Sequence, residues 1–348
     1  MIIRLAMLGF GNVGQEFVRL LQAKRSWLLS HKGLDVEVLA ISTTHHGSLM
    51  SKKALDLDKV MNQLRTEGTL KGYGPEVTDL PPMKIIEECD ADIMVELTTL
   101  NIETGQPSID HIRRAFEVGM DVITANKGPV AFAYRELRNL ARARGVHFRF
   151  EPTVMDGTPI FNLAEKTLQG CEVISLTGIL NSTSNFVLSE MGRGRTLSEA
   201  VREAQARGFA EADPSLDIDG WDASAKITAL ANVLMEADRT PKNVDRKGIR
   251  DIGKEDIADA LAKGKKIKLI ARAWREDDSV ALSVKPEEVE ADNIFWSVDG
   301  TSSGLTIKTD LMGDITVLEG NPLVTQTAYG VLSDLLLVVE DIRTNTVR

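Results

Sequence analysis

The chain has 348 residues, of which 43% are hydrophobic and 26% are charged, and its formal net charge is −10. These fractions are ordinary for globular proteins and exclude a disordered or fibrous class, while the length predicts two domains. The negative charge argues against a nucleic-acid partner, because binding one requires a basic face that neutralises phosphates. Only two cysteines occur and no apolar run approaches a membrane span, so the sequence predicts a cytoplasmic protein with neither disulfides nor a membrane partner.

The first part of the chain alternates strand-like and helix-like segments. Strands are expected over residues 2–8, 36–41, 93–97 and 121–124. Helices are expected near residues 108–119 and 132–144, whereas the polar stretch 43–79 accommodates only a helix or two around residues 51–66. This alternation predicts an α/β domain with a Rossmann-type, doubly wound parallel sheet.

The character of the chain changes near residue 148. Strand-like segments follow at residues 172–180, 267–273, 280–284 and 306–308, with helices clustered at 187–207 and 221–237. We therefore expect a dinucleotide-binding domain over residues 1–135 and an α+β domain with a mixed sheet over 136–320. The apolar helix expected over residues 325–342 lies in a last segment, 321–348, that is predicted to pack back on the first domain.

A glycine-rich loop closes the first predicted strand and opens a helix. The loop residues are Gly9, Phe10, Gly11, Asn12, Val13 and Gly14. In a Gly-x-Gly-x-x-Gly pattern the first glycine permits the turn, the second lets the backbone approach a pyrophosphate, and the third lets helix and strand pack closely. The pyrophosphate then lies at the helix N-terminus, so the loop predicts a dinucleotide cofactor.

The end of the second strand bears on the choice of cofactor. Enzymes that prefer NAD usually carry an acid there, which binds the ribose 2′-hydroxyl. This chain reads Ile41-Ser-Thr-Thr-His-His46 instead, and these hydroxyls and histidines favour NADP. The alternative is that residues 42–44 only cap the next turn and that either NADP or NAD binds.

Ligands of open α/β sheets bind beyond the carboxyl ends of the strands. Thr98 and Thr99 follow the third predicted strand and are candidates to line the nicotinamide ribose, although threonines there are often plain turn formers. Lys127 follows the fourth strand, which predicts a lysine beside the nicotinamide.

An acidic loop precedes a helix in the second domain. Its five carboxylates are Glu211, Asp213, Asp217, Asp219 and Asp222. A solvated loop would explain them, and the spacing does not match a helix-loop-helix calcium site. Asp222 and Lys226 are four residues apart, so they share one flank of the helix; such a pair is usually only a surface ion pair. Acids, donors and a lysine proton source would together suit a substrate with an ammonium, a carboxylate and an aldehyde.

Several separated segments carry a resemblance that covers nearly the whole chain. They are Gly9-Phe-Gly-Asn-Val-Gly14, Val122-Ile-Thr-Ala-Asn-Lys-Gly-Pro129, Gly178-Ile-Leu-Asn-Ser-Thr-Ser-Asn-Phe186, Ala204-Gln-Ala-Arg-Gly-Phe-Ala-Glu-Ala-Asp-Pro214 and Asp217-Ile-Asp-Gly-Trp-Asp-Ala-Ser-Ala-Lys226. In order and spacing, the sequence resembles the homoserine dehydrogenase family. The resemblance implies a nicotinamide-dependent oxidoreductase that interconverts L-aspartate 4-semialdehyde and L-homoserine in threonine, methionine and isoleucine biosynthesis.

The resemblance also implies roles for single residues. Lys226 matches the family's catalytic lysine, which protonates the carbonyl oxygen, and Lys127 matches a second active-site lysine near cofactor and substrate. Glu211 and Asp222 match residues that hold the substrate amino group, and Asp217 matches a further active-site acid.

The family's monovalent cation site, usually for sodium, maps to Glu151, Val154, Asp156 and Thr158. Met155 and Asp156 stand where the family often has small residues or glycines. The C-terminal helix, usually rich in alanine in the family, also differs in this chain, and this difference bears on the cofactor contact expected near Gly320.

The resemblance further implies a homodimer formed through the second domain. We expect neither a fused kinase domain nor a regulatory ACT domain. Two alternatives remain: a related amino-acid dehydrogenase, such as an aspartate dehydrogenase, and a non-catalytic nucleotide-sensing protein that kept the fold.

Overall fold

The computed structural model describes residues 1–344, which form two compact units. Unit 1 comprises Met1–Gly157 together with the chain from Leu323 onward, and unit 2 comprises Thr158–Pro322. The boundary expected at residues 135/136 falls inside helix α5 (Lys127–Arg144). The division comes later because β7 (Phe148–Arg149) still pairs with the sheet of unit 1 as its outermost strand.

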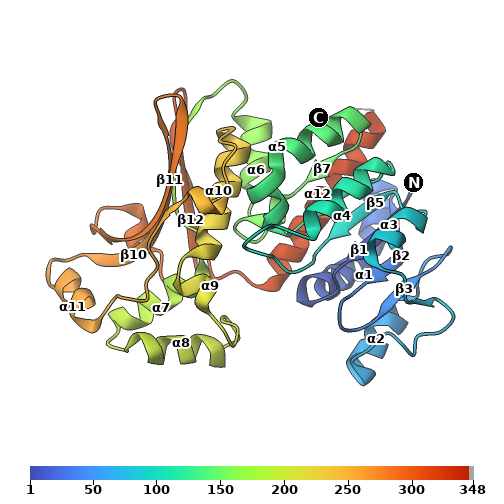
Figure 1. Cartoon of the computed structure of the whole chain (residues 1–348), viewed down its shortest axis with the longest axis horizontal. Coiled ribbons are helices and arrows are strands. Elements are labelled where there is room, and N and C mark those ends of the chain that lie inside the picture. Colours follow the sequence, from blue (N-terminus) through green and yellow to red (C-terminus); the bar gives the residue numbers. More distant parts are fainter. Residues whose placement is uncertain (345–348) are drawn as a thin grey trace. The chain divides into compact units, whose positions relative to one another are not determined.

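Within residues 1–344, unit 1 is built on a seven-stranded sheet of order β4-β3-β2-β1-β5-β6-β7 (Figure 1). Its strands are β1 (Ile2–Leu8), β2 (Asp35–Ser42), β3 (Ser48–Met50), β4 (Val77–Thr78), β5 (Ile93–Glu96), β6 (Asp121–Thr124) and β7. Strands β2, β1, β5, β6 and β7 pair in parallel, whereas β3 and β4 join one edge antiparallel. The predicted Rossmann-type parallel sheet is confirmed, and β3 and β4 occupy the stretch that the sequence left mostly unassigned.

Helices cover both faces of this sheet. They are α1 (Asn12–Lys32), α2 (Leu57–Glu67), α3 (Pro82–Glu88), α4 (Ser108–Glu117), α5 and α12 (Val324–Thr344), with a short 3-10 turn, η1 (Glu151–Thr153). Successive side chains of a strand point to opposite faces. Leu5 and Met7 of β1 therefore share a buried cluster with α1 and α12, while Leu8 joins a second cluster with α4 and α5. The parallel strands are buried on both faces, as this fold requires.

Helix α12 returns the chain to unit 1 and packs against α1. Arg343 near its end donates to the backbone oxygen of Lys32 at 2.5 Å. Asp341 accepts from Arg149 at 2.5 Å, with both side chains less than 10% exposed. An added Cβ at Gly330 would lie 2.9 Å from the Cα of Gly157, so the docking depends on a glycine in the helix. The last segment is thus part of the core of unit 1.

Unit 2 contains a six-stranded sheet of order β13-β12-β8-β10-β11-β9 within the described residues (Figure 1). Its strands are β8 (Val173–Ile179), β9 (Asp245–Arg246), β10 (Lys266–Glu276), β11 (Ser279–Val289), β12 (Ser303–Thr309) and β13 (Gly313–Glu319). Its helices are α6 (Ile160–Thr167), α7 (Ser182–Gly192), α8 (Leu197–Ala206), α9 (Ser215–Ile218), α10 (Trp221–Leu234) and α11 (Lys254–Ala262), with 3-10 turns η2 (Pro241–Asn243) and η3 (Ile294–Ser297). Neighbouring strands are antiparallel except for β9 on β11, so the expected mixed sheet is confirmed.

No helix among residues 1–344 combines the length and the apolar character needed to cross a membrane.

Candidate active site

The glycine loop forms the turn between β1 and α1. Gly9 has φ +90°, and an added Cβ would lie 2.4 Å from the backbone oxygen of Leu97, so only glycine fits there. At Gly14 an added Cβ would lie 3.1 Å from the oxygen of Gly9, which shows how closely α1 approaches the loop. A Cβ at Gly11 would meet nothing within 4 Å, and no side chain caps α1. The open backbone and the uncapped helix N-terminus fit a pyrophosphate.

The remaining loop residues divide into structural and accessible ones. Phe10 is 1% exposed, and Val13 packs against the core cluster shared by α1 and α12. Asn12, by contrast, is exposed at the first turn of α1. Asn12 is thus the side chain of the loop that remains accessible to a ligand.

The turn after β2 is closed by the hydroxyl of Thr43. Thr43 Oγ1 donates to the oxygen of Gly47 at 2.7 Å and accepts from the backbone N–H of His46 at 2.9 Å. His46 also lines a groove of about 430 Å³ beside α2, together with Arg19 and Arg65. Thr43 therefore caps the turn, as one of the two explanations expected, and the positively charged Arg19 and Arg65 lie along the groove.

A buried polar network joins the loops after β5 and β6. The carboxylate of Glu96, whose side chain is 0% exposed, accepts from the backbone N–H of Thr98 at 2.8 Å and from the Thr98 hydroxyl. Its other oxygen pairs with His111 Nδ1 at 2.9 Å. Asn126 donates to the oxygen of Thr98 at 3.0 Å and caps α5 by accepting from Gly128 N–H at 2.9 Å.

This network positions two of the predicted cofactor residues. Thr98 is held by its backbone and side chain, and Lys127 is the first residue of α5, directly after the capping Asn126. Thr99 is exposed. The sequence analysis did not identify Glu96 or His111, because their pairing depends on α4 packing against β5.

In unit 2, three of the predicted residues gather around the start of α10. Lys226 Nζ donates to the oxygen of Leu180 at 2.9 Å and forms an ion pair with Asp222 at 3.3 Å. Asn181, which follows Leu180, donates to Asp217 at 2.6 Å and to Asp222 at 2.9 Å. The cluster therefore contains two carboxylates, one ammonium and the amide that joins the acids.

The local sequence explains this arrangement. Gly220 ends the acidic loop with φ +80° and lets α10 begin at Trp221, which places Asp222 in the first turn, where a carboxylate is stabilised by the helix dipole. Asn181 is the N-cap of α7, and its side-chain oxygen accepts from the N–H of Ser184 at 2.7 Å. Asn181 was missed as a site residue, although the Asn-Ser-Thr-Ser-Asn segment that contains it signalled the family.

Burial raises the pKa of Asp217, and the negative charge of Asp222 raises it further. Hydrogen bonds from Asn181 and Thr183 and the charge of Lys226 oppose this rise. The cluster thus holds two neighbouring carboxylates with limited access to water, a setting in which an ammonium ligand would be stabilised.

Two predicted residues lie outside this cluster. Glu211 is exposed, and among residues 1–344 its carboxylate makes no hydrogen bond to the cluster, although its backbone oxygen accepts from Gln205 at 3.0 Å. Gly320 is exposed and directly follows β13 in unit 2.

The residues expected to hold a monovalent cation follow β7. Glu151 and Val154 are buried, and Asp156 adopts φ +56° directly after Met155 at φ +51°. Left-handed backbone favours glycine, so the conformation at these two positions suits the glycines of the family pattern although this chain carries Met and Asp there. Thr158 belongs to unit 2, where its hydroxyl donates to Glu319 at 3.0 Å. In the part of the chain described, no group of three His, Cys, Asp or Glu residues is arranged to hold a metal ion.

Comparisons with known proteins agree with the two units. The family model described as homoserine dehydrogenase matches residues 159–336, and the model for the NAD binding domain of homoserine dehydrogenase matches residues 9–151. The chain is 39% identical to the homoserine dehydrogenase of Sulfurisphaera tokodaii over 97% of this chain and 99% of that protein. It is 35% identical to the NAD(+)-dependent homoserine dehydrogenase of Pseudomonas canavaninivorans over 96% of this chain and 95% of that protein.

A solved structure extends the likeness to three dimensions. A hyperthermophilic archaeal homoserine dehydrogenase in complex with NADPH superimposes with a TM-score of 0.84 at 28% identity, and the match covers 100% of both chains. Sequence, fold and the two family models all agree along nearly the full length. The chain therefore belongs to the homoserine dehydrogenase family.

Proposed function

We propose that this homoserine dehydrogenase, an oxidoreductase that interconverts L-aspartate 4-semialdehyde and L-homoserine, uses Lys226 as its proton donor. When bound, the reduced nicotinamide supplies hydride to the aldehyde carbon. The carbonyl oxygen takes up a proton as that bond forms, and Lys226 Nζ provides it. The observation that carries the proposal is the cluster itself: the ammonium is held by Leu180 O at 2.9 Å and Asp222 at 3.3 Å, and its side chain is 15% exposed. A positioned, partly desolvated lysine suits general acid catalysis.

We assign the substrate ammonium to Asp217 and Asp222. Asn181 holds the two carboxylates close to one another, and a second positive charge beside that of Lys226 would stabilise them. The substrate ammonium would supply that charge. Glu211 is proposed as a third acid that approaches the substrate from the exposed loop before α9.

We propose that unit 1 binds the cofactor and that NADP is preferred over NAD. The loop from Gly9 to Gly14 holds the pyrophosphate, while Thr98, Thr99 and Lys127 lie along the nicotinamide end, and Gly320 is proposed as a further cofactor contact. Residues 42–47 contain no carboxylate, and Arg19 and Arg65 supply positive charge to the groove beside α2, which also contains Asp58. These features support a 2′-phosphate, which an acid at the end of β2 would repel.

One substitution tests this preference. Thr44→Asp places a carboxylate at an exposed position after β2 and is expected to lower kcat/KM for NADPH relative to NADH by at least tenfold. Thr44→Asn is the uncharged control. An unchanged cofactor ratio in Thr44→Asp would remove the basis for the NADP assignment.

Further proposals concern the cation, the assembly and the compartment. A sodium ion would be held largely by backbone oxygens at Glu151, Val154, Asp156 and Thr158.

A homodimer would form through unit 2, where Leu318 of β13 is 51% exposed and Ile174 of β8 is 38% exposed, as expected for apolar side chains covered by a partner. Both cysteines are free thiols, which agrees with the proposed cytoplasmic location.

The experiment that tests the proton donor follows the absorbance of reduced nicotinamide with L-aspartate 4-semialdehyde. Lys226→Met is expected to lower kcat by roughly 10²- to 10⁴-fold, the usual contribution of a general acid, while the cofactor Kd stays unchanged. Lys242→Met, at an exposed lysine, is the matched control. Full turnover by Lys226→Met would contradict the assignment. No turnover by the unmodified protein, with cofactor still bound, would favour the sensor alternative.

A further inference from the structure

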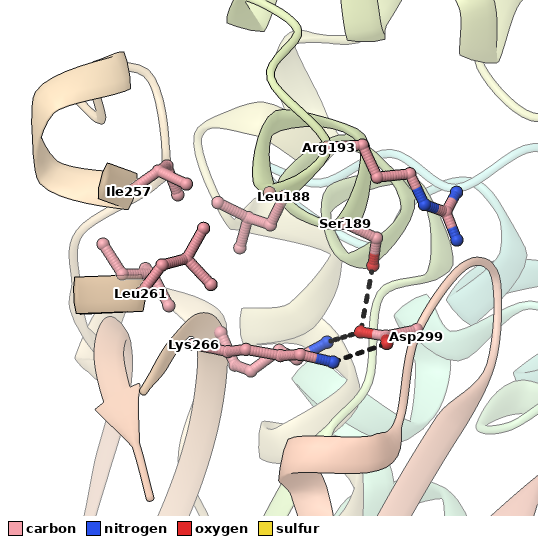
Figure 2. A pocket seen from close by; sticks show the side chains of 10 residues that line it. Leu188, Ser189, Arg193, Ile257, Leu261, Lys266 and Asp299 are labelled. Carbon is pink, nitrogen blue, oxygen red and sulfur yellow. Dashed lines mark hydrogen bonds and ion pairs between the residues drawn. The ribbon is translucent and has the colours of Figure 1, made fainter. Parts of the chain in front are cut away.

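A cavity of about 160 Å³ lies in unit 2 between α7, α11 and the start of β10 (Figure 2). It has room for roughly five water molecules, or for a ligand of similar size. None of the residues proposed for hydride transfer, substrate binding or cofactor binding is among those that line it. The cavity is therefore distinct from the site described above.

The lining has an apolar side and a charged side, as Figure 2 shows. Leu188 of α7 and Ile257 of α11 are 3% and 5% exposed, whereas Leu261 of α11 is 44% exposed. An apolar ligand group placed against these side chains would cover the exposed part of Leu261. The charged side contains Lys266 and Asp299. This combination suits a small molecule with a short aliphatic body and one charged group.

The charged side carries more positive than negative charge. Asp299 accepts from Lys266 at 2.6 Å through one oxygen and from Lys268 at 2.7 Å through the other. One carboxylate thus serves two ammonium groups, whereas Arg193, which also borders the cavity, already pairs with Glu190. Lys268 is 1% exposed and also donates to Asn185 at 3.0 Å, so its charge has little access to water. An anionic ligand would balance this charge, and a cationic ligand would be repelled.

Helix α7 connects the cavity with the acid cluster. Asn181, Asn185 and Ser189 are spaced four residues apart and therefore share one face of the helix. Asn181 holds Asp217 and Asp222, Asn185 accepts from Lys268, and Ser189 contacts Asp299 at 3.5 Å and accepts from Gly300 N–H at 3.1 Å. Along the helix, Asn185 N–H donates to the oxygen of Asn181 at 3.2 Å and Ser189 Oγ donates to the oxygen of Asn185 at 2.7 Å, so polar contacts extend from the proposed substrate acids to the wall of the cavity.

We propose that this cavity is an effector site for a short, branched aliphatic carboxylate. The carboxylate binds Lys266, and the branched body packs on Leu188, Ile257 and Leu261. Because the bound anion competes with Asp299 for Lys266, it changes the contact between Asp299 and Ser189 and shifts α7. The shift reaches Asn181 and alters the affinity for the substrate ammonium. This coupling rests on the substrate role proposed for Asp217 and Asp222, whereas the binding itself does not.

Binding is tested by calorimetric titration of the whole chain with isovalerate and with its uncharged analogue isovaleramide, in the absence of substrate. The acid is expected to bind and the amide to bind at least tenfold more weakly. Lys266→Met is expected to weaken isovalerate binding about tenfold, as the loss of a hydrogen bond to a charged group does. Lys263→Met, which changes a neighbouring exposed lysine paired with Glu288, is the matched control and should bind normally. Equal binding of acid and amide, no binding of either, or equal losses in the two variants would overturn the site.

Coupling is tested by the KM for homoserine with and without isovalerate. The unmodified protein should show a change of about fivefold or more, the usual lower end of allosteric coupling. Lys266→Met should lose the change and keep its kcat. A change of the same size in Lys266→Met would mean that isovalerate acts at the substrate site. Binding at the cavity with no change in KM would overturn the coupling through α7 and leave the binding site standing.

Discussion

The buried pair of Glu96 and His111 leads to a quantitative prediction. The Glu96 side chain is 0% exposed and that of His111 is 6% exposed, so neither group can replace its partner with water. His111→Ala removes one hydrogen-bond partner of the buried Glu96 carboxylate and opens a cavity in the core, which together typically cost about 3 kcal/mol. For a unit of this size, each kcal/mol lowers Tm by roughly 2 to 4 °C, so His111→Ala is expected to lower Tm by roughly 6 to 12 °C.

The assay combines thermal unfolding with cofactor kinetics. His111→Asn keeps a donor near the position of Nδ1 and should restore part of the Tm. Because Glu96 also holds Thr98, His111→Ala should raise the cofactor KM more than it lowers kcat. Arg25→Ala, which removes an exposed ion pair with Asp35, is the control and should leave Tm almost unchanged. The reasoning is refuted if His111→Ala and Arg25→Ala have the same Tm.

Three further predictions concern the loop, the acid cluster and the terminal helix. Gly9→Ala forces a Cβ to within 2.4 Å of the Leu97 oxygen and should abolish cofactor binding in a fluorescence titration; retained binding would contradict the close approach. Burial is the first cause of the raised pKa of Asp217, so the folded state binds the proton of this carboxyl group more tightly than the unfolded state does. The contribution of Asp217 to stability is therefore present at low pH and is lost as the pH rises through the raised pKa. Asp217→Asn should therefore have a higher Tm than the unmodified protein at about pH 8 but not at about pH 3. An increase in Tm that does not depend on pH would exclude this explanation. Asp341→Asn breaks the buried pair with Arg149 and should destabilise unit 1 by about 3 kcal/mol in denaturant unfolding, whereas a change like that of an exposed pair would show that α12 docks without it.

The sequence identified those parts of the fold that repeat a pattern over many residues. The alternation of apolar strands and periodic helices predicted the parallel sheet, and the apolar period over residues 325–342 predicted α12. Strands β3 and β4 contain three and two residues, too few to show a period, so the stretch 43–79 that contains them was predicted without strands. Strand β13 was also missed, because most of its residues are exposed or only half-buried and its apolar residues Ile315, Val317 and Leu318 do not keep to one face.

In the candidate site, a contact within one helix could be predicted from the sequence, whereas contacts between distant segments could not. Asp222 and Lys226 could be paired from their spacing on one helix, and the structure contains that ion pair. Asn181 bonds to acids 36 and 41 residues further along the chain, a contact that no local pattern encodes. Glu96 could be assigned only to a strand, because its partner His111 belongs to a helix that packs on the sheet.

The return of α12 to unit 1 has a consequence for synthesis on the ribosome. Val331, Leu335 and Val338 belong to the same buried cluster as β1 and α1, yet they are translated only after all of unit 2. At usual elongation rates unit 2 takes roughly 10 to 30 seconds to synthesise, and during that time the nascent sheet lacks one of its covering helices. Unit 2 can fold from a continuous stretch of chain, but unit 1 must wait, with apolar surface open to chaperones, until the final helix leaves the exit tunnel.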